Sequence, residues 1–172
     1  MVDDVSRHNQ KQWDELARSR LEYTLPLLDL TPAAARARID PLGILGDVTG
    51  KAVLCLATGG GQQSACFALL GAHVTVVDLS SIQLERDQEA AAHYGYAVRT
   101  IHGDIRDLAP LDGDSFDLVY QAYSLNFVPS VAPVFQEVAR VLRPGGLYQV
   151  QWANPFTHSV DDQAWDGETY LL

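Results

Sequence analysis

Short apolar runs alternate with helical patterns along the chain from about residue 52 onward. The runs are rich in β-branched residues and too short for buried helices, so they predict strands. These strands are expected at residues 52–57, 73–79, 97–104, 115–123 and 146–153. Helical patterns fill the segments between them, at residues 62–71, 80–95 and 130–146. Gly71 and Gly95 are placed to end the first two helices, and Pro144 to stop the third.

The first 50 residues have a different pattern. Apolar residues spaced among charges between residues 3 and 20 predict an exposed, partly amphipathic helix. Thr31 is a suitable N-cap, and Pro32 then occupies the first position of a second helix. We therefore divide the chain into an N-terminal helical lid and entry segment, residues 1–50, and a core, residues 51–172, within one domain.

The strands of the core have no clean polar face, and helices separate them. This pattern is typical of a parallel sheet that is covered on both sides. The predicted fold class is α/β, a doubly wound and mostly parallel sheet with helices on both faces. Ligands of such sheets bind beyond the carboxyl ends of the strands.

Three consecutive glycines follow the first predicted strand, in the segment ATGGGQ at residues 57–62. Bare backbone at this point lets a ligand approach, and the N–H groups at the start of the next helix favour a negatively charged group. Asp78 ends the second predicted strand, where a carboxylate can accept both hydroxyls of a ribose. Together they predict a nucleoside site. The alternative is that the glycines form a tight turn and Asp78 caps the next helix.

Composition narrows the class of ligand. The 172 residues carry a net charge of −10, which argues against a nucleic-acid backbone as the main partner. No run approaches the roughly 20 apolar residues that cross a bilayer, and the charged N-terminus lacks a signal-peptide pattern, so we expect no membrane partner and a cytoplasmic location. Cys55 and Cys66 are expected to be buried small hydrophobes, and the histidines lack ligand spacing, so no metal is assigned.

Four segments carry a resemblance to a known family: VLCLATGGG, VTVVDLS, HGDIRDLAPLDGDSFDLVY and EVARVLRPGGLY. In this order, from about Val53 to Val150, the chain resembles the class I S-adenosylmethionine-dependent methyltransferases of the small-molecule type. The resemblance implies a Rossmann-like fold, S-adenosyl-L-methionine as cofactor and a small-molecule methyl acceptor. The segment NQKQWDELA is similar to the leading helix that often lies over the cofactor in this family.

The resemblance also implies roles for individual residues. Asp78 would hold the ribose hydroxyls with Leu79 against the adenine, and Asp104 with the Ile105 N–H would read the adenine edge. The glycine loop would face the methionine part, and the segment after the fourth strand would lie beneath the methyl group. The cofactor-binding residues are then Ala57, Thr58, Gly59, Gly60, Gly61, Gln62, Asp78, Leu79, Gly103, Asp104, Ile105, Gln121, Ala122 and Tyr123.

The glycine motif departs from the family pattern at two positions. Cys55 stands where the family usually has an acidic residue that orients the loop or neighbours the ammonium group of the cofactor, and Ala57 stands where it usually has glycine. A methyl group at position 57 fits only if the backbone φ there is negative. The departures motivate one alternative, a non-catalytic cofactor-binding module.

A second alternative is a nicotinamide-dinucleotide-dependent oxidoreductase, because Gly59, Gly61 and Asp78 approximate a dinucleotide-binding pattern. Ser64 at the third glycine position argues against it. No catalytic residue is assigned. The candidates near the expected pocket are Tyr123, Asn126, Trp152 and His158.

The C-terminal stretch after residue 153 lacks the two β-rich runs with which the family fold ends. We therefore expect an incomplete version of the fold, with its fifth strand at an open edge that invites self-association. We also expect a competent cofactor half, an incomplete acceptor pocket and little methyl transfer by these 172 residues alone.

Overall fold

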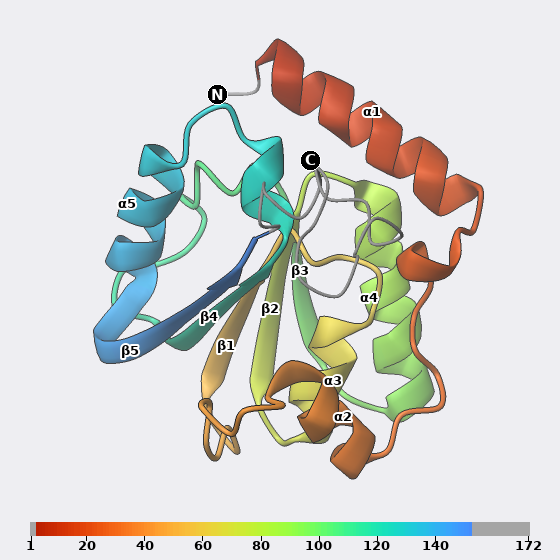
Figure 1. Cartoon of the computed structure of the whole chain (residues 1–172), viewed down its shortest axis with the longest axis vertical. Coiled ribbons are helices and arrows are strands. Elements are labelled where there is room, and N and C mark those ends of the chain that lie inside the picture. The colour runs from red at the N-terminus through yellow and green to blue at the C-terminus, as the bar shows by residue number, and fades with distance from the viewer. Residues whose placement is uncertain (1–2, 153–172) are drawn as a thin grey trace, which may run out of the picture.

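A computed structural model describes residues 3–152 of the chain. One five-stranded sheet forms its centre, with helices on both sides (Figure 1). In chain order the elements are α1 (Asp4–Arg18), a 3₁₀ turn η1 (Glu22–Thr24), α2 (Pro32–Ile39), β1 (Ala52–Leu56), α3 (Gln63–Leu69), β2 (His73–Asp78), α4 (Ser81–Tyr94), β3 (Val98–His102), β4 (Phe116–Ala122), a 3₁₀ turn η2 (Ser124–Phe127), α5 (Ala132–Val141) and β5 (Leu142–Gln151).

The strand order is β3-β2-β1-β4-β5, and all four pairings are parallel. The chain therefore runs outward from β1 in both directions, which confirms the predicted doubly wound α/β fold. The reversal falls between β1 and β4, so the crevice of the sheet opens where these two strands end.

Alternate side chains of the central strands are buried on opposite faces of the sheet. Val53 and Cys55 belong to the core under α2, α3 and α4, whereas Leu54 and Leu56 belong to the core under α5. All four side chains are fully buried. A strand that is buried on both faces must be apolar at every position, which explains the continuous run seen in the sequence.

Local capping signals set the helix ends as expected. The Thr31 side chain accepts a hydrogen bond from the Ala34 N–H, and Pro32 begins α2. Gly71 (φ 85°) and Gly95 (φ 75°) follow α3 and α4 in the left-handed region, where glycine carries no Cβ penalty.

The third predicted helix ends earlier than Pro144. α5 stops at Val141, and the chain enters β5 at Leu142. The pairing then slips, because Phe116 faces Leu142 while Leu118 faces Leu147. Residues 143–146 bulge out of the ladder, because Pro144 has no N–H to donate and the backbone turns at Gly145 (φ 81°).

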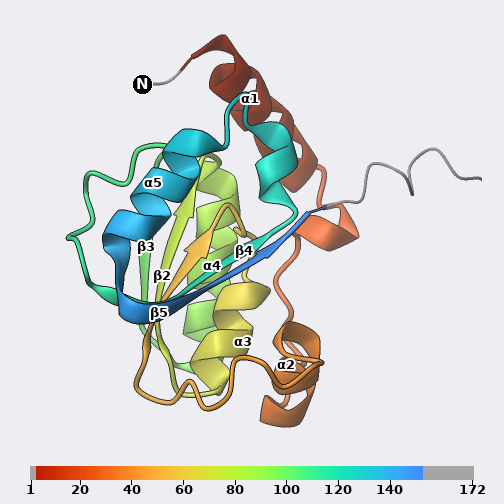
Figure 2. The same cartoon turned by 60° about the vertical axis from the view of Figure 1, so that its left-hand side comes forward.

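Helix α1 lies across the carboxyl ends of the strands, and both views show it above the sheet (Figures 1 and 2). None of the helices within residues 3–152 is long and apolar enough to cross a membrane. In the same range β5 pairs only with β4. The prediction about missing final strands concerns residues 153–172, which lie outside the described residues, so it and the expected self-association stay predictions.

Candidate functional site

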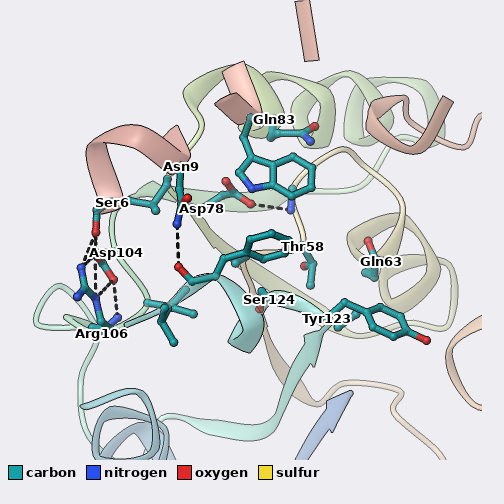
Figure 3. Close-up of a pocket in the computed structure, with 18 of the residues that line it drawn as sticks. Ser6, Asn9, Thr58, Gln63, Asp78, Gln83, Asp104, Arg106, Tyr123 and Ser124 are labelled. Atoms are coloured by element: carbon teal, nitrogen blue, oxygen red, sulfur yellow. Dashed lines mark hydrogen bonds and ion pairs between the residues drawn. The ribbon is translucent and has the colours of Figure 1, made fainter. Parts of the chain in front are cut away.

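A cavity of about 360 Å³ lies beneath α1, at the carboxyl ends of the strands. Its wall comes from α1, the loop after β1, the ends of β2, β3 and β4, and η2 (Figure 3). This is the crevice at which open α/β sheets bind ligands. Ten of the residues expected from the sequence line it: Ala57, Thr58, Gly59, Gln62, Asp78, Leu79, Asp104, Ile105, Ala122 and Tyr123.

Four expected residues lie behind this wall. Gly103 and Gln121 do not line the cavity, and Gln121 is fully buried between Ser124 and Tyr148, with which it shares hydrogen bonds. Gly60 and Gly61 are also set back from it.

The loop after β1 contains glycines mainly because α4 packs against it and leaves no room for side chains. A Cβ at Gly61 would lie 2.5 Å from the Arg86 carbonyl oxygen, and one at Gly59 would lie 2.6 Å from Gln83 Cβ. Gly60 (φ 114°) and Gly61 (φ 70°) also need a backbone conformation that other residues avoid. At Gly59 and Gly61 the close neighbour of the bare backbone is therefore a helix of the protein.

Two carboxylates occupy the N–H groups of this loop. Asp78 Oδ2 accepts from the Gly59 N–H at 2.9 Å, while the Asp87 oxygens accept from the N–H groups of Gly60 and Gly61 at 3.3 and 3.2 Å. Asp87 comes from α4 and is fully buried. The N–H groups of these three glycines are thus bound by the protein itself, whereas the anion site expected from the sequence lies at the first N–H groups of α3, which begins at Gln63.

Asp78 is held at the cavity wall by backbone donors. Its second oxygen, Oδ1, accepts from the Ser80 N–H at 2.8 Å, and only 8% of the residue is exposed. Burial raises the pKa of Asp78, against the pull of the Gly59 and Ser80 N–H groups. A carboxylate has about four acceptor positions. Two are used here, so two remain for donors in the cavity.

Asp104 is differently placed, because protein donors already surround its carboxylate. Arg106 Nε and Nη2 donate to it at 3.0 and 2.6 Å, the Arg106 N–H at 2.9 Å, and Ser6 Oγ of α1 at 2.7 Å (Figure 3). Burial alone would raise the pKa of Asp104, but the bonds from Arg106 and Ser6 outweigh it and lower the pKa. Its acceptor positions are therefore taken, unlike those of Asp78.

Two residues at the cavity wall adopt strained backbone conformations. Ala57 has φ 46° and Tyr123 has φ 56°, both in the left-handed region that non-glycine residues avoid. The condition of a negative φ at position 57 is therefore not met. The Ala57 N–H donates to the Val77 carbonyl oxygen at 2.8 Å, and this strand-to-strand bond helps hold the turn in place despite the methyl group.

Residues 54–150 match the methyltransferase domain family. The match covers more than half of the chain and begins and ends within β1 and β5. The chain belongs to the S-adenosylmethionine-dependent methyltransferases. The family recognised in the sequence is confirmed, and S-adenosylmethionine is its methyl donor.

Individual methyltransferases agree. An uncharacterized methyltransferase of Bacillus subtilis (strain 168), YbaJ, is 32% identical over 166 residues, covering 91% of this chain and 65% of its own. A demethylmenaquinone methyltransferase of Clavibacter sepedonicus is 38% identical over 109 residues, covering 63% of this chain and 44% of its own. The chain thus spans less than two thirds of the length of either relative.

Solved structures share the fold. Phosphoethanolamine N-methyltransferase 1 of Haemonchus contortus, in complex with phosphoethanolamine and S-adenosylhomocysteine, superposes with a TM-score of 0.69 at 24% identity, over 90% of this chain and 34% of that one. A methyltransferase of Mesorhizobium loti gives 0.58 at 30% identity, over 72% and 55%.

The residues of this methyltransferase fit the cofactor of the family. Gln83 Oε1 and Thr58 Oγ1 are buried at the cavity wall without a hydrogen-bond partner among the described residues. Unpaired buried acceptors are costly, so they favour a ligand with hydrogen-bond donors. The ribose hydroxyls and the ammonium group of S-adenosylmethionine are such donors, and the carboxylate of Asp78 suits a cation. Within residues 3–152 no cluster of three or more potential ligands could hold a metal.

Several residues that line the cavity were not predicted from the sequence. Gln83 sits one turn into α4, and only the packing of α4 against the loop brings it to the cavity. Arg38 and Gln63 also line the cavity, and Figure 3 shows Gln63 on the opposite side from Asp104. α1 contributes Ser6, Asn9 and Trp13, of which the last two belong to the segment NQKQWDELA.

The catalytic candidates named from the sequence differ in their position relative to the cavity. Tyr123 lines the cavity and is 57% exposed (Figure 3). Asn126 and Trp152 are exposed and form no part of the wall. His158 lies outside the described residues.

Proposed function

We propose that this methyltransferase transfers a methyl group from S-adenosylmethionine to a small-molecule acceptor. The observation that carries the choice of cofactor is the occupation of the loop N–H groups by Asp78 and Asp87. A dinucleotide needs such N–H groups for its pyrophosphate. S-adenosylmethionine has no phosphate and carries positive charge, which the carboxylate of Asp78 at the cavity wall favours. This argues against the nicotinamide alternative.

The cofactor would lie along the wall from Asp104 to Tyr123. In this proposal the free acceptor positions of Asp78 hold the ribose hydroxyls, with Gln83 Oε1 as a further acceptor near them. Leu79 and Ile105 supply the apolar surfaces for the adenine. Asp104 contributes less to adenine recognition than the family pattern implies, because Arg106 and Ser6 use its oxygens.

When bound, the cofactor supplies an electrophilic methyl group on a sulfonium. The protein then has to orient the two reactants and exclude water, since most of the catalysis in such a transfer comes from positioning. Trp13 of α1 makes edge-to-face contacts with Phe127 of η2, at 5.7 Å between ring centroids, and with Tyr23, at 6.4 Å. This aromatic cluster covers the cavity, as proposed for the N-terminal lid, residues 1–50.

The cavity has the size of a small-molecule site, and in this proposal the cofactor occupies it. Its volume of about 360 Å³ lies at the low end of the range for small-molecule pockets, roughly 300–1,000 Å³. The net charge of −10 opposes the binding of a nucleic acid. Two relatives, the demethylmenaquinone methyltransferase and a ubiquinone biosynthesis O-methyltransferase of Hahella chejuensis, carry names that indicate small-molecule pathways.

The test is a transfer assay with S-adenosylmethionine labelled at the methyl group. The protein is incubated with a panel of small metabolites, and in parallel with bulk RNA and with a protein mixture. Label that appears in the small-molecule fraction supports the proposal. Label that appears only in RNA or protein contradicts the proposed acceptor class. Cofactor binding without any transfer fits either the non-catalytic module or the incomplete acceptor pocket expected of these 172 residues, and transfer by a longer chain would distinguish the two.

A further inference from the structure

Asp87 is a buried carboxylate with no role in the reaction described so far. It lies on α4, one turn beyond Gln83, and is fully buried behind the glycine loop. Its Oδ1 accepts from the Gly61 N–H at 3.2 Å and from Ser64 Oγ at 2.5 Å, while Oδ2 accepts from the Gly60 N–H at 3.3 Å. One side chain thus joins α4 to the loop after β1 and to the first turn of α3.

These bonds restrain a backbone of high intrinsic freedom, together with the bond from the Gly60 N–H to the Gln83 carbonyl oxygen at 3.1 Å. Gly60 and Gly61 both have positive φ, and glycine has more conformational freedom than any other residue. The next residue toward the cavity, Gly59, is tied to Asp78. The loop that forms the cavity wall is therefore held from behind by Asp87 and from the front by Asp78.

The surroundings of Asp87 favour its neutral form. Desolvation by burial and the nearby charge of Asp78 on β2 together raise its pKa to about 7, against the bonds from Ser64 and the glycine N–H groups. Cys55 on β1 and Tyr96 after α4 also face it, and the charge of Asp87 raises the pKa of both. Burial, together with such nearby charges, raises the pKa of Cys55 above its usual range and that of Tyr96 to about 12, so neither titrates near neutrality.

We propose that Asp87, in its ionised form, is a positioning residue for the cofactor: it locks the glycine loop into the conformation that binds S-adenosylmethionine. The carboxylate reaches the loop from α4, whereas position 55, at the end of β1, holds a cysteine. This inference concerns cofactor affinity alone and does not depend on which acceptor the enzyme methylates.

The proposal has two consequences of opposite sign. A group whose pKa is higher in the folded state than in the unfolded chain binds more protons when folded. Ionisation of Asp87 therefore lowers the stability of the free protein as pH rises from about 4 to about 7, with no further change above. Over the upper part of the same range cofactor affinity rises, because only the carboxylate can accept all three donors.

The test compares wild-type protein with Asp87→Asn. The amide has nearly the same size, but its NH₂ group faces an N–H donor of the loop. Calorimetric titration with S-adenosylhomocysteine above about pH 8 should show an affinity at least about tenfold lower for the variant, the factor for one lost charge-assisted hydrogen bond. Toward about pH 5.5 the two affinities should converge. Asp78 and every other titrating group that both proteins share contribute equally to the two pH profiles of affinity. Their contributions therefore drop out of the difference between the profiles.

Glu85→Gln is the matched control, since it removes the same charge from an exposed position of the same helix. Its affinity should equal that of the wild type at every pH. Thermal unfolding of the free proteins supplies the second readout: the stability of the wild type relative to Asp87→Asn should fall between about pH 4 and about pH 7.

Ser64→Ala keeps the proposal testable if Asp87→Asn does not fold. Loss of the Ser64 hydroxyl removes a bond that lowers the pKa of Asp87, so the rise of affinity should move to higher pH. Parallel pH profiles for wild type and Asp87→Asn would overturn the proposal. So would an unshifted profile for Ser64→Ala, or an equal loss of affinity in Glu85→Gln.

Discussion

Ser6 Oγ donates a 2.7 Å hydrogen bond to Asp104 Oδ2, although the two residues lie 98 positions apart in the chain. Ser6 belongs to α1 and Asp104 follows β3. Arg106 binds both of them, and its Nη1 also lies 2.7 Å from Asp3 Oδ2 at the N-cap of α1. These four residues, which we call the α1 anchor, attach the N-terminal helix over the cavity.

Removal of the central cation should release α1. Arg106→Gln leaves the Asp104 carboxylate buried without its ion-pair partner, and we expect a loss of about 1–3 kcal/mol in the free energy of unfolding. Denaturant unfolding measures this loss, and hydrogen exchange should show faster exchange in residues 4–18. Arg7→Gln, which removes an exposed pair with Asp4, is the control and should cost under about 0.5 kcal/mol.

Acid should release the same helix. The bonds from Arg106 lower the pKa of Asp3, and those from Arg106 and Ser6 outweigh burial to lower the pKa of Asp104. A carboxylate with a lowered pKa in the folded state stabilises above its unfolded value of about 3.9, and that contribution disappears as pH falls through the folded value. Exchange in residues 4–18 should thus accelerate below about pH 4. Acceleration that begins near pH 6 would contradict this assignment.

Asp78→Ala should weaken the binding of S-adenosylhomocysteine more than Asp104→Ala does. Asp78 keeps two acceptor positions for the ribose, and a charge-assisted hydrogen bond contributes about 1.5–3 kcal/mol, which corresponds to roughly 10- to 150-fold in affinity. The acceptor positions of Asp104 are already used by donors within the α1 anchor. Calorimetric titration of both variants with S-adenosylhomocysteine measures the two losses of affinity. An affinity of Asp78→Ala equal to that of the wild type would refute the ribose assignment.

Ala57→Gly should stabilise the protein or leave it unchanged. The positive φ of Ala57 costs an alanine about 1 kcal/mol, which offsets the greater entropy of glycine in the unfolded chain. Ala68→Gly, in the last turn of α3, should instead cost up to about 1 kcal/mol, because glycine disfavours helix. Chemical denaturation shows whether each variant gains or loses free energy of unfolding relative to the wild type. A loss of more than about 1 kcal/mol in Ala57→Gly would show that its methyl group packs usefully.

The sequence was informative where structure depends on near neighbours. Thr31 with Pro32, and Gly71 and Gly95, act within one turn of a helix, so the composition at these points predicts the helix ends. The five strands and the carboxyl-end location of the site follow from the alternation of apolar runs with helices. The start of β5 was misplaced, because a bulge is a property of the pairing between two strands.

The rest depends on contacts between distant segments. Asp87 has the sequence context of an ordinary helical carboxylate, and only the approach of α4 to the glycine loop gives it donors 23 to 27 residues away. The conformation of Ala57 is likewise imposed by the strand ends it joins. The α1 anchor spans about 100 residues, so no local pattern could reveal that Asp104 is already occupied.

Carboxylates fill the N–H groups of Gly59, Gly60 and Gly61 in the loop after β1, so this loop should hold a phosphate-free nucleoside. Parallel calorimetric titrations of the same protein with S-adenosylhomocysteine and with NAD distinguish the two kinds of ligand. We expect saturable binding of S-adenosylhomocysteine with one site per chain, and no heat of binding with NAD at the same concentrations. Saturable binding of NAD, with S-adenosylhomocysteine unable to displace it, would show that the loop binds a pyrophosphate instead.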